Sequence, residues 1–261
     1  MLQDYKIHVQ ERLEQGIPPL PLNAEQVSGL VELLKSPPPS EEEYILDMIT
    51  NRTPAGVDPA AYIKAAFLTD VAKGNTSCPL IDRKHATKLL GTMLGGYNVE
   101  SLINLLTDDE VGSLAADGLC NTLLMFNAKH DVIELAKENE NAKKVVESWS
   151  EAEWFTSKPE LPEMIKAIVF RVDGEINTDD LSPAPDAPSR PDIPLHALAM
   201  LKKTMQDPIT TIDKLKESGL PVVFVGDVVG TGSSRKSATN SLLWHIGEDI
   251  PFIPNKKQAG I

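Results

Sequence analysis

Apolar residues recur at three- and four-residue spacing between Asn23 and Phe155, and this spacing predicts a succession of short amphipathic helices. The breaks between the periodic stretches are rich in Pro, Gly, Asn and Asp, which end helices. A charged, helix-like segment, MLQDYKIHVQERLEQG, comes before them. The expected helices cover residues 24–36, 40–52, 58–73, 82–93, 98–107, 111–126, 128–137 and 139–155.

Several of these helices carry recognisable start signals. Asp58, Asp82 and Asn98 stand where an N-cap side chain would accept a backbone hydrogen bond, and Ser40 with Glu43 predicts a capping box. Taken in pairs, the helices begin near residues 24, 58, 98 and 128, a loose repeat within the range of two-helix solenoid units of the HEAT or armadillo kind. An irregular helical superhelix is therefore expected.

The pattern changes after WFTSKPELPEM, where the β-branched and aromatic run KAIVFRV predicts a strand. We place a domain boundary within residues 156–165, with domains over residues 1–160 and 161–261. Alternating strands and helices in the second domain predict an α/β unit with an at least partly parallel sheet. Its expected elements are a strand over 166–172, helices over 195–205 and 209–218, a strand over 221–226 and a helix over 234–246.

Two segments of the second domain are candidates for function. The loop GEINTDDLSPAPDAPSRPDIP, residues 174–194, has few apolar anchors, and its prolines favour a fixed functional loop over a floppy one. The turn GTGSSR joins the second strand to a helix, whose N-terminal N–H groups attract an anion. Ser233 or Ser234 would cap this helix, and Arg235 would grip a carboxylate or phosphate. A purely capping role, with Arg235 in solvent, remains open.

Composition limits the alternatives. The 261 residues carry a formal net charge of −13, which disfavours non-specific binding to nucleic acid or anionic membranes. Cys78 and Cys120 lie far apart, so we expect buried core cysteines and no disulfide scaffold or complete metal site. The N-terminus has no signal-peptide pattern, which predicts a soluble, cytoplasmic protein without a membrane partner. The turn lacks the P-loop, dinucleotide and nucleophile-elbow motifs, and His245 is expected in the core or on the surface.

The two candidate segments together resemble one known domain. GDVVGTGSSRKSATNSLLW (residues 226–244) and GEINTDDLSPAPDAPSRPDIPLHALAML (residues 174–201) are similar to the swivel domain of the bacterial aconitase B family. The helical half resembles the HEAT-like domain that precedes the swivel in that family. The resemblance implies a multidomain protein, an all-α HEAT-like superhelix followed by an α/β (β/β/α) swivel domain, of which this sequence holds the N-terminal part.

The resemblance also implies roles for particular residues. Ser233 matches the family's catalytic base, which takes a proton from the carbon next to a carboxylate. Ser234, Arg235 and the loop residue Arg190 match residues that bind substrate carboxylates. The segment NTDDLS resembles the family's active-site Thr-Asp pair, which points less firmly to Thr178, Asp179 and Ser182.

The implied reaction is the reversible isomerisation of citrate and isocitrate through cis-aconitate. The family's [4Fe–4S] cluster is held by three cysteines of later domains, so its ligands are expected outside this chain, and the isolated chain is expected to be inactive. The implied partners are the three substrates and the remaining aconitase domains. Weak citrate binding is compatible with the two arginines.

A second hypothesis comes from a different class of protein. The helical solenoid would serve as a non-catalytic module that binds a protein partner or forms a homodimer. RNA binding, a second role of aconitases, is a third hypothesis, but the excess of acidic residues makes this segment a poor RNA binder on its own.

Overall fold

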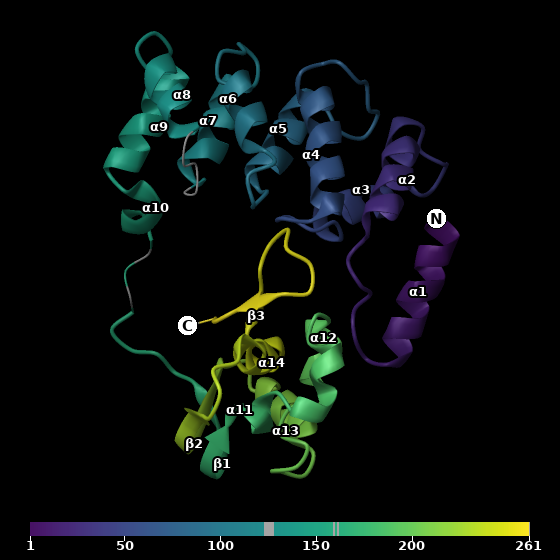
Figure 1. Cartoon of the computed structure of the whole chain (residues 1–261), viewed down its shortest axis with the longest axis vertical. Helices are drawn as coiled ribbons and strands as arrows, with labels where there is room; N and C mark the ends of the chain where they lie inside the picture. The colour runs from purple at the N-terminus through teal and green to yellow at the C-terminus, as the bar shows by residue number, and fades with distance from the viewer. Residues whose placement is uncertain (123–127, 159, 161, 261) are drawn as a thin grey trace. The chain divides into compact units, whose positions relative to one another are not determined.

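The computed structural model describes residues 1–122, 128–158, 160 and 162–260, and the chain divides into two compact units (Figure 1). The helical unit contains residues 1–4, 21–160 and 252–254, and the α/β unit contains residues 5–20, 161–251 and 255–261. Within the described residues, no helix combines the length and the apolar character needed to cross a membrane.

The helical unit contains a helix at each position that the apolar spacing predicts, which confirms the periodic pattern as helical. Residues 123–127 of the expected 111–126 helix lie outside the described residues. Its helices are α2 (Ala24–Lys35), α3 (Glu42–Asn51), α4 (Pro59–Ala72), α5 (Arg83–Gly91), α6 (Val99–Leu105), α7 (Gly112–Cys120), α8 (Lys129–Leu135), α9 (Glu140–Ser150) and α10 (Glu153–Thr156).

Two of the predicted helix caps are confirmed. The carboxylate of Asp58 accepts a hydrogen bond from Ala60 N at 2.8 Å, and that of Asp82 accepts one from His85 N at 2.7 Å. Asn98 is in the N-cap position, but its side chain turns back and donates to Leu90 O at 2.7 Å. The capping box at Ser40 is wrong, because α3 begins after Glu41 and Ser40 has a positive φ of 68°.

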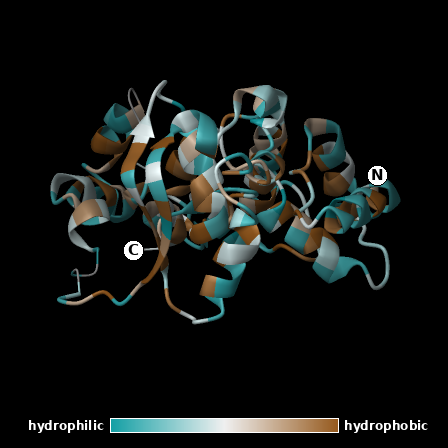
Figure 2. Cartoon of the chain, turned by 90° about the horizontal axis from the view of Figure 1, so that it is seen from below, coloured by the Kyte–Doolittle hydropathy of each residue, from teal (hydrophilic) through white to brown (hydrophobic). Residues whose placement is uncertain are grey.

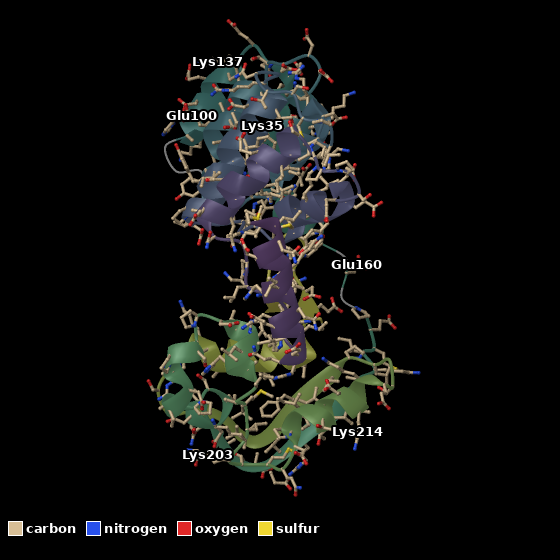
Figure 3. The ribbon with its side chains drawn as sticks, turned by 90° about the vertical axis from the view of Figure 1, so that its right-hand side faces the viewer. Lys35, Glu100, Lys137, Glu160, Lys203 and Lys214 are labelled. Carbon is tan, nitrogen blue, oxygen red and sulfur yellow. The ribbon has the colours of Figure 1, made fainter. Side chains whose placement is uncertain are left out.

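The helices bury one face each, and Figure 2 shows hydrophobic and hydrophilic residues alternating around their ribbons. Charged side chains such as Glu100 and Lys137 extend from the exterior of the unit in Figure 3. Helices α5 and α7 approach closely at two glycines, since a Cβ on Gly118 would stand 2.9 Å from the Cα of Gly91. Such contact between backbones requires that both positions lack a side chain.

The cysteines differ from expectation. Cys78 and Cys120 are free and only partly buried, so the prediction of buried core cysteines is wrong. The thiol of Cys78 donates to Leu34 O at 3.3 Å, which gives this half-exposed side chain a polar partner.

The α/β unit is built on two parallel strands, β1 (Ile168–Asn177) and β2 (Val222–Thr231), which confirms the expected parallel pairing. Helix α1 (Leu2–Glu14) contributes its residues from Tyr5 onward to the same unit. The remaining elements are α11 (Thr178–Leu181), the 3-10 helix η2 (Ala184–Ser189), α12 (Ile193–Ala197), α13 (Pro208–Lys216), α14 (Lys236–Ile246), β3 (Glu248–Asp249) and β4 (Lys257–Gln258), the last two forming a separate antiparallel pair.

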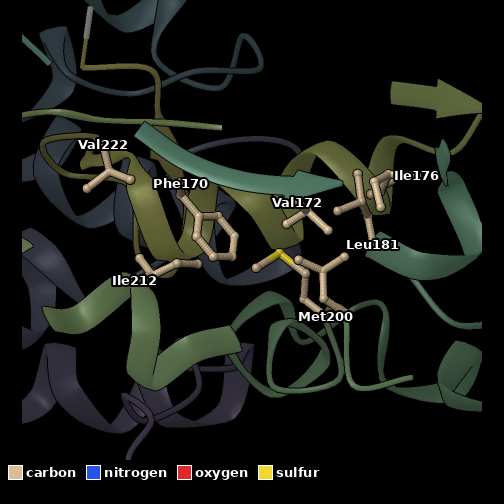
Figure 4. Packing of buried hydrophobic residues seen from close by; sticks show 9 residues of the cluster. Phe170, Val172, Ile176, Leu181, Met200, Ile212 and Val222 are labelled. Carbon is tan, nitrogen blue, oxygen red and sulfur yellow. The ribbon is translucent and has the colours of Figure 1, made fainter. Parts of the chain in front are cut away.

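One face of the parallel pair packs on the core of this unit. Figure 4 shows Phe170 and Val172 of β1 facing Met200 and Ile212, with Val222 of β2 at the same layer. These side chains are between 0% and 6% exposed, so the buried face fixes which residues of β1 point inward. His245 also lies in the buried part of the unit, where its Nε2 donates to Ala197 O at 2.9 Å, in agreement with a core histidine.

Three boundaries in the α/β unit differ from the sequence prediction. The expected loop 174–194 is largely structured, because β1 continues to Asn177 and three short helices follow. The helix expected over 195–205 stops at Ala197, and Leu201 adopts a positive φ of 57°. Strand β2 runs on through the glycine turn to Thr231, since Gly230 adopts a φ of 83° that other residues rarely accept.

Lys64 on α4 is a buried cation in the helical unit. Its side chain is 0% exposed, and its Nζ donates to Thr50 O at 3.3 Å. Burial lowers the pKa of Lys64 to about 8, because the charged amine loses its hydration. Since the unfolded chain binds this proton more tightly, the free energy of unfolding should rise as the pH increases from about 8 to 10.5.

We therefore expect Lys64→Met to stabilise the chain at pH 7 by up to about 3 kcal/mol, the value of a pKa shift of this size. The gain should shrink between pH 8 and pH 10.5, where the wild-type amine loses its proton. Urea unfolding of both proteins across this pH range measures the difference. A gain that does not change with pH would show that the pKa of Lys64 is the same in the folded and the unfolded chain.

Candidate anion-binding site

The site forms where the two parallel strands end. Asn177, the last residue of β1, is paired in register with Thr231, the last residue of β2. The carboxyl ends of parallel strands lie at the same edge of a sheet, so the segments that follow the two strands come together. These segments are α11 with Ser182, and the turn from Gly232 to Arg235. The two sequence motifs, about 55 residues apart in the chain, thus share one edge.

A hydrogen bond joins the two segments directly. Thr178 Oγ1 donates to the backbone carbonyl of Ser233 at 2.7 Å, and Thr178 is only 6% exposed. Gly232, with a φ of 89°, lies against this hydroxyl, since a Cβ there would be 3.5 Å from Thr178 Oγ1. Thr178 therefore fixes the backbone of the turn and has its own hydroxyl occupied.

An ion pair holds the arginine of the turn. Arg235 Nη1 donates to the carboxylate of Asp179 and, at 3.2 Å, to the backbone carbonyl of Ser182. The hydrogen bond from Arg235 keeps the pKa of the Asp179 carboxyl below its usual value, and the charge of Arg190 acts in the same direction. Asp179 is therefore ionised at neutral pH and orients the guanidinium. The Nε and Nη2 donors of Arg235 have no partner among the described residues.

The serines do not cap the helix that follows. The N-cap of α14 is Arg235, and no side chain of the described chain caps this end of the helix. The prediction that Ser233 or Ser234 caps the helix is therefore wrong. Both serines are exposed, and within the described residues neither hydroxyl has a recorded hydrogen bond. The first N–H groups of α14 and two hydroxyls are consequently available to a ligand.

Arg190 follows the 3-10 helix η2 as its C-cap residue. Its backbone N donates to Ala187 O at 3.1 Å, which anchors the residue, while its side chain is partly exposed. The Nε atom is buried and has no partner in the described structure. A buried donor without a partner is costly, so a group that accepts from Arg190 would be stabilising there.

Ser182 belongs to a buried network that joins three segments. Its Oγ lies 2.8 Å from His196 Nε2 and 2.7 Å from Ser237 Oγ, and its side chain is fully buried. On the other side of the ring, His196 Nδ1 lies 2.8 Å from Ser189 Oγ, which itself donates to Asp186 O. The network links α11, the η2 loop and α14.

The directions of these bonds follow from one donor. Because Ser189 Oγ gives its hydrogen to Asp186 O, it accepts from His196, which places the proton on Nδ1. Nε2 then accepts from Ser182, and Ser182 accepts from Ser237. Burial lowers the pKa of His196, which favours this neutral form. A second proton on the ring would make Nε2 a donor and reverse the direction of its hydrogen bond with Ser182.

Sequence reasoning missed part of this arrangement. Asn177 caps α11 by accepting from Asp179 N at 2.7 Å and Asp180 N at 3.0 Å, and the N-x-x-D spacing was a readable signal for it. His196 and Ser237 carry no such signal, because their partners lie 7 to 55 residues away at spacings that belong to no helix-capping or turn motif. A hollow of about 330 Å³ borders the site and is lined by Asp179, Asp180, Pro183, Ala184, Pro185 and Lys203.

A larger hollow of about 530 Å³ in the same unit is not part of the site. Its lining is mainly apolar, with Leu220, Phe224 and Leu243 among its residues, and it includes none of the predicted site residues. Its size reflects the gap between β2 and α14 and carries no evidence of anion chemistry.

Comparison with known proteins places this arrangement in a family. Residues 4–155 match a family model described as the aconitate B N-terminal domain, and residues 167–261 match one described as the aconitate hydratase 2 N-terminus. The chain belongs to the aconitase B family. The resemblance found in the two motifs is thereby confirmed over the whole chain.

Individual members of the family are close in sequence. Proteins named aconitate hydratase B from Pseudomonas aeruginosa, Synechocystis and Escherichia coli are 59%, 58% and 55% identical to it. Each alignment covers 100% of this chain but only 30–31% of the relative. The chain thus spans about a third of the length of these aconitase B proteins.

The neutral state of His196 leads to a pH prediction for the α/β unit. The pKa values of His196 and His245 are both lowered by burial, so the unfolded chain binds protons more tightly near pH 6.5. The free energy of unfolding should therefore fall as the pH is lowered from 7 to 5, by at most about 1.4 kcal/mol per pH unit for each histidine. Urea unfolding at several pH values measures this slope.

Two variants test whether His196 contributes to this pH dependence of the free energy of unfolding. His196→Gln should reduce the slope while lowering stability at pH 7, because it removes the titrating ring and part of the network. His130→Gln replaces an exposed histidine and should leave the slope as in the wild type. An unchanged slope in His196→Gln would contradict the buried neutral imidazole.

Proposed function

We propose that this chain is part of an aconitate hydratase, which interconverts citrate and isocitrate through cis-aconitate by removing and adding water. The observation that carries the proposal is that α11 and the turn of Ser233, Ser234 and Arg235 meet at the common edge of β1 and β2, where Asp179 pairs with Arg235 and also feels the charge of Arg190. Membership in the aconitase B family supports it, as do the relatives' names. The full-length protein would be the active species, because the relatives are about three times as long.

The proposal includes the architecture and location of the protein. The helical unit would be a HEAT-like superhelix, and the α/β unit would be the first part of a β/β/α swivel domain. A position in the cytoplasm fits a tricarboxylic acid cycle enzyme of this family. The partners of the chain would be citrate, isocitrate, cis-aconitate and the remaining domains of the same polypeptide.

Arg190 and Arg235 would bind substrate carboxylates. A tricarboxylate needs several donors that converge from different segments, and these two arginines follow η2 and β2 respectively. Arg235 is held by Asp179 through one Nη atom, which leaves its Nε and Nη2 donors for a carboxylate. Arg190 brings a buried Nε donor without a partner. Ser234 would add a hydroxyl donor beside Arg235.

Ser233 would act as the base that removes a proton from the carbon next to a carboxylate. A serine hydroxyl is a very weak acid, so its alkoxide needs strong stabilisation. The uncapped N-terminus of α14 and the guanidinium of Arg235 lie next to it in the chain and supply positive potential. The hydroxyl group leaves the neighbouring carbon as hydroxide while the C–C double bond of cis-aconitate forms, and this hydroxide together with the proton removed by Ser233 makes up the water that is released.

The residues assigned less firmly would have supporting roles. Thr178 holds the backbone of Ser233, and Asp179 orients Arg235. Ser182 is fully buried, so it would position the loop and the helix without touching substrate. This division leaves the exposed groups for the ligand and gives the buried groups to the scaffold.

The family's [4Fe–4S] cluster does not fit the residues of this chain. Such a cluster is held by several cysteine thiolates. The sequence contains two cysteines, and the described residues include no group of three or more side chains that could hold a metal ion. We therefore assign the cluster, as a Lewis acid for the substrate hydroxyl, to the remainder of the full-length enzyme.

The role of Ser233 predicts the behaviour of one variant. In the full-length enzyme, Ser233→Ala should lower kcat by about a hundred-fold to ten-thousand-fold, the usual contribution of a general base. The absorbance of the cluster should not change. Ser218→Ala, at an exposed serine near the end of α13, should keep wild-type turnover and serves as the control. Wild-type turnover in Ser233→Ala would refute the assignment of the base.

The anion site itself can be tested on the 261-residue chain. Titration with millimolar citrate should shift the backbone amide signals of residues 232–236, because the ligand would contact the start of α14. Arg235→Gln should abolish the shifts. Arg171→Gln should retain them, although Arg171 also pairs with carboxylates, those of Asp173 and Asp227. Equal shifts in both variants would place citrate elsewhere.

A further inference from the structure

Arg12, on α1, makes a two-pronged ion pair with a residue 180 positions later in the chain. Its Nη1 donates to Asp192 Oδ2 at 2.6 Å, and its Nη2 donates to Asp192 Oδ1 at 2.9 Å. The side chains are only 7% and 15% exposed. Both residues belong to the α/β unit. This contact is unrelated to the solenoid packing that the sequence suggests for the N-terminal residues.

The guanidinium of Arg12 is also held by the segment that directly follows α1. Arg12 Nε donates to Pro18 O at 2.8 Å, in the segment that follows α1. That segment is tied to the helix again, because Tyr5 Oη donates to Leu20 O at 2.9 Å and Leu20 N donates to His8 Nε2 at 3.0 Å. Helix α1 and residues 15–20 therefore present Arg12 in one fixed orientation.

Asp192 lies in the short loop between η2 and α12, the segment that also contains Arg190. It lies two residues after Arg190 and is the N-cap of α12, where its Oδ1 accepts from Leu195 N at 3.4 Å. Its backbone carbonyl accepts from His196 N at 2.9 Å, and its N donates to Ser189 O at 2.9 Å. Holding the carboxylate of Asp192 thus restrains both the turn that carries Arg190 and the helix that carries His196.

A nearly buried ion pair is weak evidence for stability, because removing two charges from water costs free energy that their attraction has to offset. Its geometry, however, is restrictive, since two parallel hydrogen bonds allow one relative orientation of the planar groups. A loop of short helical turns gains order from such a contact. The order matters most for Arg190, whose buried Nε has no partner among the described residues.

We propose that Arg12 is a positioning residue for substrate binding: through Asp192 it fixes the η2–α12 loop so that Arg190 meets a substrate carboxylate. This inference rests on the proposed function for the role of Arg190. The restraint of the loop by Arg12 does not depend on it. The N-terminal helix thereby becomes part of the binding machinery without touching the substrate.

Hydrogen exchange of the ligand-free 261-residue chain tests the restraint. Arg12→Lys keeps a positive charge beside Asp192 but loses the paired hydrogen bonds, so it avoids a buried unpaired carboxylate. We expect exchange at the amides of Arg190, Asp192 and His196 to speed up by about ten-fold or more, because the exchange rate rises in proportion to the fraction of time that the loop is open. Exchange in α14 should remain as in the wild type. Unchanged exchange in the loop, or an equal rise throughout the unit, would overturn the proposal.

Kinetics of the full-length enzyme test the consequence for substrate. Arg12→Lys should raise KM for citrate by about ten-fold with kcat within about two-fold, because fewer molecules hold Arg190 in place before binding. Arg12→Gln combined with Asp192→Asn removes both charges, keeps a side chain able to cap α12 and should give the same KM change. An unchanged KM in both proteins would overturn the role in substrate binding.

A matched arginine provides the control. Arg83 in the helical unit also donates through Nε to a backbone carbonyl, that of Ala72, and through its Nη atoms to Asp108 and Glu110. Arg83→Lys should leave both loop exchange and KM unchanged, and a KM rise equal to that of Arg12→Lys would overturn the proposal. If the wild-type enzyme shows no turnover of citrate, the proposed function fails, whereas the exchange measurement still decides whether Arg12 restrains the loop.

Discussion

The parallel pairing of β1 and β2 is the constraint on which the candidate site depends. It brings the two strand ends, Asn177 and Thr231, to one edge, so that segments about 55 residues apart in sequence meet there. An antiparallel pairing would carry one of the segments to the opposite edge. The hydrogen bond from Thr178 to the carbonyl of Ser233 and the ion pair of Asp179 with Arg235 are short contacts that only this pairing permits. The register of the strands is fixed in turn by the buried face around Phe170.

Polar groups at this edge divide into two sets with different surroundings. Ser182, Ser189, Ser237 and His196 satisfy one another in a network with a single consistent direction, and a network of this kind rigidifies the segments that it joins. Ser233 and Ser234 instead are exposed at the start of a helix without a side-chain cap from the described residues, and Arg235 beside them is only partly buried. The first set is already ordered by folding, so binding of a ligand requires no further free energy to order it. The second set keeps its hydrogen-bonding capacity for an anion.

Much of this could be predicted from sequence, and the failures have physical causes. The helices of the first half were predictable because each buries one face, and the parallel strands because both are β-branched runs separated by helical segments. Residues 174–194 were expected to form a loop without regular structure. Their short helices were not predictable, because they depend on long-range contacts, such as that of Asp192 with Arg12, which local sequence preferences do not reveal. The prediction that a serine caps the last long helix was wrong because α14 begins only at Lys236. Gly232 has a positive φ, so the chain is still in a turn at Ser233 and Ser234. His196 and Ser237 were missed because their partners lie 7 to 55 residues away in the chain, at spacings that match no local pattern.

The charge at the site follows from the same arrangement. A chain with a formal net charge of −13 attracts anions only where cations are concentrated locally. Arg235 is partly neutralised by Asp179, but this carboxylate also fixes the direction of the remaining donors of the guanidinium. Arg190 is left without such a partner among the described residues, and its orientation instead comes from the backbone that Asp192 and Arg12 restrain. Arg235 is therefore oriented by a contact of its own side chain, whereas Arg190 is oriented by the backbone of its loop. For this reason, substitutions outside the site that loosen the loop should disturb Arg190 and leave Arg235 in place.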